Sequence, residues 1–169
     1  LRNELKSLKK FATLSPMPGF VPWLLNDLDN NYLAFLTSDQ DKTLTSLGPK
    51  ESPKASLVYL LNETQWIKNP EIKAVLEPIL LRLAAHYLLI EKRAGGTALD
   101  SVAHFHLNNG ARIEQLNWAA DLSSRGVEQS AGIMLNYLYL SDDIDANHES
   151  YRSGQEIILS PGVRNLLKD

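Results

Sequence analysis

The spacing of apolar residues changes near residue 100, and this change limits the folds open to the chain. Between residues 21 and 93, apolar side chains recur every three or four positions, which is the period of helices that bury one face. From residue 101 the run SVAHFHL alternates instead, which is the period of a strand with one buried face. We therefore expect an α+β protein with a helical segment at about 21–93 between its strands.

Helix start signals divide the helical segment into three helices. Pro22 suits the first turn of the first helix. The other two each begin with an N-cap residue followed by proline, at Ser52-Pro53 and at Asn69-Pro70. The expected helices span residues 22–35, 53–66 and 70–93, and the polar residues 37–50 are expected to form a loop.

Strands are expected on both sides of the helical segment. The run KFATLS should end at Ser15, because Pro16 and Pro18 cannot continue a central strand. Ser15 is therefore expected at the end of a strand, where a side chain can reach a cleft. Further along, SVAHFHL and ARIEQLNWA flank the tight-turn sequence Asn108-Asn109-Gly110, so we expect a β-hairpin there.

The last third of the chain is expected to be helical or irregular. Residues 121–140 predict a loop that leads into a helix capped by Ser123 or Ser124. The candidates for the buried side of this helix are Ile133, Met134, Tyr137 and Leu138. The acidic residues 141–150 predict a loop, and Ser160-Pro161 should begin a terminal helix.

Composition excludes several kinds of function. The formal net charge is −3 and the pI is about 5.8, so no overall positive charge attracts nucleic acid. There is no cysteine, which removes disulfides, thiolate nucleophiles and cysteine-based zinc sites. No apolar run reaches the length of a membrane span. The first residues, LRNELKS, form a helical pattern with no N-cap before it, so we expect the downstream part of a longer protein.

Two histidines in the expected hairpin raise the question of a metal site. His104 and His106 lie two positions apart, so on a strand they would share one face. A zinc site needs a third or fourth ligand, however, and the sequence has no second HxH and no HExxH motif to supply one. From spacing alone, two polar residues on a solvated strand face are the simpler interpretation.

Two stretches together resemble the malonyl-CoA decarboxylase family. FATLSPMPGF, residues 11–20, is similar to the family pattern F-x-x-LSP-[IM]-PGF. VAHFHLNNGARIEQLNWAADLSSRGVEQSAGIMLNY, residues 102–137, is similar to V-A-x-FHL-x-NGA, NW-x-AD-x-S-x-RG and S-x-G-x-M-x-NY. The motifs are long and are separated by the helical segment. The resemblance runs along the whole chain but covers only part of the family's length.

The resemblance implies a fold and a domain organisation. Members of the family combine an N-terminal helical domain with a catalytic domain that resembles the GNAT acetyltransferase fold. Residues 1–169 would be the C-terminal portion of that catalytic domain, with a helical insert at about 21–93 and a C-terminal β-hairpin plus helices. The helical domain, and the glycine-rich turn that holds the CoA pyrophosphate at a helix start, would precede Leu1.

The resemblance also implies catalytic residues. Carried over by motif, the family's catalytic serine is Ser15 and its catalytic histidine is His106. His104 does not match a family histidine and is then a bystander, which leaves no metal site. Asn117 and Arg125 fall inside the matched block and are candidates for substrate binding, with structural support as the alternative.

The implied reaction is the decarboxylation of malonyl-CoA to acetyl-CoA and CO2. Loss of CO2 leaves an enolate delocalised onto the thioester carbonyl, so the reaction requires no metal, biotin or pyridoxal cofactor in principle. We expect Ser15 to orient the carboxylate and His106 to handle the proton. A covalent malonyl-serine is the weaker alternative. The sequence does not decide which residue protonates C2.

The same resemblance implies partners and a location. The expected ligands are malonyl-CoA and acetyl-CoA, and a homo-oligomer is expected, with neither nucleic acid nor membrane as a partner. The absence of cysteine and a C-terminus, NLLKD, without an SKL-type tripeptide favour bacterial cytoplasm, with mitochondrial and peroxisomal locations left open. The competing interpretation is a non-catalytic CoA-thioester-binding module or a helical assembly module.

Overall fold

The computed structural model describes residues 9–26, 36–49, 52–154 and 156–168. The helix expected at the start of the chain lies outside these residues, as does much of the one expected at 22–35. The elements, in chain order, are β1 (Lys10–Ser15), α1 (Phe20–Asn26), α2 (Ser38–Leu47), α3 (Pro53–Glu63), the 3-10 turn η3 (Gln65–Lys68), α4 (Pro70–Leu89), α5 (Ser101–Asn108), β2 (Arg112–Asn117), α6 (Ser124–Ser130), β3 (Met134–Leu140), α7 (Ile144–Arg152) and α8 (Pro161–Asn165). The expected α+β class is confirmed.

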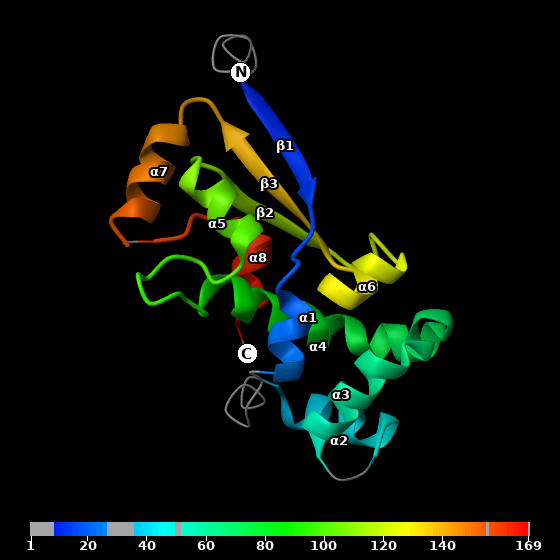
Figure 1. Cartoon of the computed structure of the whole chain (residues 1–169). Coiled ribbons are helices and arrows are strands. Elements are labelled where there is room, and N and C mark those ends of the chain that lie inside the picture. Colours follow the sequence, from blue (N-terminus) through cyan, green and yellow to red (C-terminus); the bar gives the residue numbers. More distant parts are fainter. Residues whose placement is uncertain (1–8, 27–35, 50–51, 155, 169) are drawn as a thin grey trace.

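The three described strands form one antiparallel sheet in the order β1-β3-β2. The last strand in the chain is therefore the central one, and Ser15 at the end of β1 pairs with Leu135 of β3. A register shift between Ile113 and Gln115 places one extra residue in β2. Figure 1 shows the sheet in the upper half of the molecule, with α5, α7 and α8 to one side and α1–α4 below.

One continuous apolar core joins the sheet to the helical segment. Tyr137 of β3, Leu80 of α4 and Phe20 of α1 are fully buried members of the same cluster. Aromatic rings hold α1 against α4, since the ring of Trp23 lies 5.2 Å from that of Tyr87. Helices α1–α4 therefore fold as part of the domain that contains the strands.

The expected starts of the helices at Ser52 and Asn69 are confirmed by their capping bonds. Ser52 accepts from the Ala55 N–H, and Asn69 accepts from the N–H groups of the first turn of α4. The expected loop at 37–50 is wrong, because α2 occupies most of it. Thr37 and Gln40 form a capping box, and Leu44 buries one side of an otherwise polar helix. The helix expected to reach Arg93 ends at Leu89, because the chain folds back through a bond from Arg93 N to Thr97 O.

The expected β-hairpin after residue 100 is wrong in its first half. SVAHFHL is the helix α5, because Asp100 caps its N-terminus by accepting from the N–H groups of Val102 and Ala103. Its buried residues are Ala103, His106 and Leu107, which have the i, i+3, i+4 spacing of a helix face. The second half is confirmed as a strand, β2.

Two further expectations after residue 120 are corrected. The helix start capped by Ser123 is confirmed as α6, but the helix ends at Ser130 instead of continuing through Leu138. Residues Met134–Leu140 form β3, because a nearly all-apolar run can be buried as a central strand. The acidic segment expected as a loop contains α7, while the terminal helix capped by Ser160 is confirmed as α8.

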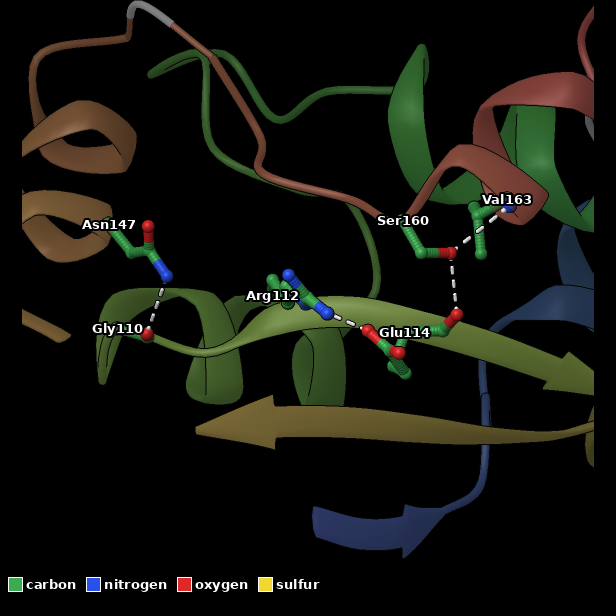
Figure 2. A network of polar contacts seen from close by, with 6 residues as sticks. All are labelled: Gly110, Arg112, Glu114, Asn147, Ser160 and Val163. Atoms are coloured by element: carbon green, nitrogen blue, oxygen red, sulfur yellow. Dashed lines mark hydrogen bonds and ion pairs between the residues drawn. The ribbon is translucent and has the colours of Figure 1, made fainter. Parts of the chain in front are cut away.

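Polar contacts attach the last two helices to β2 (Figure 2). Asn147 of α7 donates from Nδ2 to the carbonyl of Gly110, in the turn that joins α5 to β2, over 3.1 Å. Ser160 donates from Oγ to the carbonyl of Glu114 over 2.6 Å and also accepts from the Val163 N–H. The outer edge of β2 is thereby covered by the segment that leads into α8.

Over the ranges that the structure describes, no helix combines the length and the apolar composition needed to cross a membrane.

The turn at Gly110 provides a stability test of how α5 meets β2. Gly110 has a φ of +84°, and a Cβ there would lie 2.9 Å from the carbonyl carbon of Ile144. Gly96 has a similar φ of +80° but open space around it. We expect Gly110→Ala to lower the free energy of unfolding by about 2–4 kcal/mol and Gly96→Ala by only about 1 kcal/mol. Urea unfolding measures both, and equal losses would show that crowding by Ile144 is absent.

Candidate active site

The two residues singled out by motif meet in the structure. The Ser15 Oγ lies 3.1 Å from His106 Nε2, although 91 positions separate the two residues. Both are almost completely buried, with 7% of Ser15 and 8% of His106 exposed. Ser15 is the last residue of β1 and His106 lies on the buried face of α5, so regular secondary structure holds each partner.

The imidazole ring of His106 is fixed from two directions. Its Nδ1 lies 2.7 Å from the hydroxyl of Tyr139, and its face stacks on Tyr137 with 4.2 Å between ring centroids. Both tyrosines come from the central strand β3, and their side chains alternate onto the face that also carries Leu135. Because Ser15 pairs with Leu135, the serine and the two tyrosines share this face of the sheet.

A chain of four side chains crosses the site. Tyr139 contacts His106, His106 contacts Ser15, and the Ser15 hydroxyl donates to the Oγ1 of Thr13 over 3.2 Å. With that donation the histidine carries its proton on Nε2 and accepts from Tyr139 at Nδ1. When the Ser15 proton turns to Nε2 instead, Nδ1 carries the proton and donates to Tyr139. The chain can therefore move a proton to or from the serine.

Burial sets the protonation states of this chain. It lowers the pKa of His106 below the usual 6.5, so the imidazole is neutral at pH 7 and able to accept a proton. It raises the pKa of Tyr139 to about 12, so that hydroxyl keeps its proton. A neutral imidazole next to a protonated phenol and a serine is suited to general acid–base chemistry.

The segment after Ser15 is anchored at two backbone N–H groups. Met17 N donates to the Oγ of Ser130, which is fully buried at the end of α6, over 3.0 Å. Gly19 N donates to Oδ2 of Asp100 over 3.3 Å. Residues 16–19, called the serine loop from here on, are thus held by side chains from two other segments.

Asn117 lies on the other side of the sheet from the Ser15–His106 pair. Its Nδ2 donates to the Met134 carbonyl and, over 2.8 Å, to Oδ1 of Asn136. Asn136 in turn donates to the carbonyl of Thr13 over 3.0 Å. On β3, Asn136 alternates with Leu135 and Tyr137, so these amides lie on the opposite face and connect all three strands.

Arg125 lies on the surface in the first turn of α6. Its charge is one of the smaller influences on Asp121, whose pKa is lowered mainly by hydrogen bonds from Ser123. Among the described residues, Arg125 forms no hydrogen bond with Ser15 or His106.

The premise of the metal site is wrong, because His104 and His106 do not share a face. On a helix, side chains two positions apart point about 200° away from each other. Nδ1 of His104 lies 2.8 Å from the hydroxyl of Tyr151, away from the serine. Within the described ranges, no group of three or more potential metal-binding side chains is found.

Four residues that contribute to the candidate site were not identified from the sequence. They are Asp100, Ser130, Tyr137 and Tyr139. Both tyrosines belong to a segment expected to be helical, where their alternation in NYLYL could have indicated a strand. Asp100 directly precedes a helical i, i+3, i+4 pattern, which is the place of an N-cap residue.

Comparison with known proteins covers the whole chain. The family model described as the malonyl-CoA decarboxylase C-terminal domain matches residues 1–169. The mitochondrial malonyl-CoA decarboxylase of goose, Anser anser anser, is 35% identical over 96% of this chain, and that of Mus musculus is 35% identical over 99%. The chain spans about a third of the length of these relatives, 33% and 35% respectively.

Solved structures give the same result. The crystal structure of malonyl-CoA decarboxylase from Rhodopseudomonas palustris is 38% identical to this chain, with a TM-score of 0.78. The match covers 98% of this chain and 35% of that one. The enzyme from Agrobacterium vitis is 36% identical with a TM-score of 0.78, covering 100% of this chain and 38% of that one.

The lowered pKa of His106 gives a pH prediction. The unfolded chain binds a proton at about pH 6.5, above the folded-state pKa. The stability contributed by the neutral ring is therefore present above about pH 6.5 and is lost as the pH falls through the folded-state pKa. We expect nitrogen NMR of the isotope-labelled protein to show a pKa below 6.5 for His106.

The free energy of unfolding of His106→Asn should fall less steeply on acidification than that of the wild-type chain. His86 contributes in the same direction, because burial lowers its pKa too, and it is unchanged in this comparison. A folded-state pKa of 6.5 or higher for His106 would contradict the assignment of a neutral buried ring.

Proposed function

The chain belongs to the malonyl-CoA decarboxylase C-terminal domain family, and from this premise we propose that the full-length protein converts malonyl-CoA to acetyl-CoA and CO2. One observation carries the proposal to specific residues: the buried contact of 3.1 Å between Ser15 and His106, each of which lies in a family motif. The proposal concerns the full-length protein, because the relatives are about three times as long as this chain.

The reaction sets three requirements for the protein. The bond between C2 and the departing carboxyl carbon breaks, and its electron pair moves onto the thioester carbonyl to form an enolate. C2 then takes up a proton, which restores the thioester as acetyl-CoA. The protein has to hold the carboxylate out of the carbonyl plane, stabilise the enolate oxygen and deliver the proton.

The Ser15–His106 pair fits two of these requirements. We assign the Ser15 hydroxyl to a hydrogen bond with the carboxylate that departs, and Nε2 of His106 to delivery of its proton to C2. The ring then regains a proton from solvent, because each turnover consumes one proton. The Tyr139 hydroxyl at Nδ1 keeps the ring in the orientation and tautomer that present the Nε2 proton. In the alternative, the Ser15 Oγ attacks the thioester carbonyl while His106 takes its proton, the C–S bond breaks, and CoA leaves as the thiol with that proton, which gives a malonyl-serine. After the loss of CO2, the same thiol takes back the acetyl group.

The other candidate residues receive a different proposal. The bonds of Asn117 to Met134 and Asn136 support a structural role in the sheet instead of substrate binding. Arg125 is exposed at the start of α6, where a cation would suit the anionic groups of CoA, and substrate binding stays a prediction for it.

The finer parts of the fold and setting also stay predictions. These are the GNAT-like fold, the boundary of the helical insert at about 21–93, the upstream CoA-binding turn, the homo-oligomer and the bacterial cytoplasm. Helices α1–α4 follow β1 and precede β2 and β3 in the chain, which is where the insert is expected. This order supports the prediction. A helical assembly module does not require a buried Ser–His contact, so this pair favours the enzyme over that alternative.

Turnover of malonyl-CoA by the full-length polypeptide tests the catalytic assignment. We expect Ser15→Ala and His106→Asn each to lower kcat by about 100-fold or more, because each removes a group that acts on the reacting atoms. Ser46→Ala, on the exposed part of α2, is the matched control and should retain wild-type turnover. Full activity in His106→Asn would remove the histidine from the mechanism.

A second variant tests the role of Tyr139. Tyr139→Phe removes the hydroxyl at Nδ1 but keeps the ring that stacks on Phe11 at 4.4 Å, so the core should stay intact. We expect kcat to fall about tenfold, which is less than the loss caused by removing the imidazole itself. An unchanged kcat and an unchanged His106 pKa in this variant would show that the hydroxyl does not orient the ring.

A further inference from the structure

Asp100 is a buried carboxylate whose two oxygens contact different parts of the site. It is 1% exposed and stands immediately before α5. Among the described residues, four groups form hydrogen bonds with it, and all four are donors, as an acceptor-only carboxylate requires. Burial of a carboxylate costs free energy unless its hydrogen bonds are complete. Capping of α5 uses only two of the four bonds, so the other two point to a second role.

The first oxygen, Oδ1, holds the helix that carries the histidine. It accepts from Val102 N and Ala103 N, both over 3.0 Å. These bonds fix the N-terminus of α5, and His106 follows less than two helical turns later on the buried face. The position of the imidazole therefore depends on where Asp100 lies.

The second oxygen, Oδ2, holds the serine loop. It accepts from Gly19 N over 3.3 Å, four residues after Ser15, and from the Tyr87 hydroxyl of α4 over 3.2 Å. Burial, and after it the charge of Asp100, raises the pKa of Tyr87 well above its usual range, so this hydroxyl keeps its proton and donates. The same carboxylate thus joins the serine loop, α4 and α5.

We propose that Asp100 is a positioning residue that sets the separation of Ser15 Oγ and His106 Nε2, a role that rests on the proposed function of this pair. On one side, β1 pairs with β3, and β3 provides the tyrosines against His106. On the other side, Asp100 ties the chain just after Ser15 to the start of α5. Ser15 and His106 are therefore connected through the sheet on one side and through Asp100 on the other. Loss of either connection allows the distance between the serine and the histidine to increase.

The substitution Asp100→Asn separates the two halves of this role. Asparagine caps helices as well as aspartate does, so its amide oxygen can keep the bonds to Val102 and Ala103. Its amide NH2 then faces the Gly19 N–H, and two donors cannot bond. The variant should retain α5 but release the serine loop, and Tyr87→Phe should remove only the bond from α4.

The test compares kcat and KM for malonyl-CoA, together with the His106 pKa, in full-length protein. Because misplacement of a reacting group by about 1 Å can cost about 100-fold, we expect Asp100→Asn to lower kcat by about tenfold or more. KM should change less than about threefold, and the His106 pKa should shift as its serine partner moves away. Tyr87→Phe should show a smaller loss of kcat in the same direction.

Ser52→Ala is the matched control, since it removes the cap of α3, whose residues make no bond to the pair. It should lower stability while kcat and the His106 pKa stay at wild-type values. If it loses as much kcat as Asp100→Asn at equal loss of stability, the role of Asp100 is structural only and the proposal fails. If Asp100→Asn does not fold, the result with Tyr87→Phe decides in its place.

The two proposals fail in different ways. Wild-type protein without decarboxylase activity overturns the proposed function, while the His106 pKa in Asp100→Asn still tests the positioning role. Active wild-type protein with the same kcat and the same His106 pKa in Asp100→Asn overturns the positioning role and leaves the proposed function standing.

Discussion

The antiparallel pairing of β1 with β3 determines where the candidate site lies. It places Ser15 opposite Leu135 and Thr13 opposite Tyr137, so these two residues of β1 face the same side as the tyrosines of β3. On that side Tyr137 and Tyr139 contact the imidazole of His106. The serine, the histidine and the phenol come from three separate segments, and the central strand is what brings them together.

Signals confined to a few residues predicted the structure well. The caps at Ser52, Asn69 and Ser160 depend only on their own side chains and the next turn of backbone, and all three helices begin there. SVAHFHL is different, because it fits both a period of two and a helical i, i+3, i+4 face. The Asp100 cap and the packing against β3 decide between them, and the second of these depends on residues far away in the sequence.

The candidate site was likewise predictable only in part. Ser15 and His106 were found through a motif resemblance, and spacing alone assigned them no chemistry. The contact with Tyr139 could not be foreseen while β3 was expected to be a helix, since only a strand aligns that hydroxyl with Tyr137 on one face. Burial of the completed chain of side chains then fixes the protonation states, because the solvation that each group loses is a property of the whole fold.

The extra residue in β2 has a consequence for how this sheet can tolerate insertions and deletions. The register shift between Ile113 and Gln115 is confined to an outer strand, so the pairing of β1 with β3 continues without interruption beside it. A one-residue change in the length of β3 would instead present Asn136 and Leu138 to the histidine, because alternate residues face opposite sides. A change in the length of β2 therefore leaves the pairing that positions Ser15 intact, whereas a change in the length of β3 removes the two tyrosines from the face that meets His106.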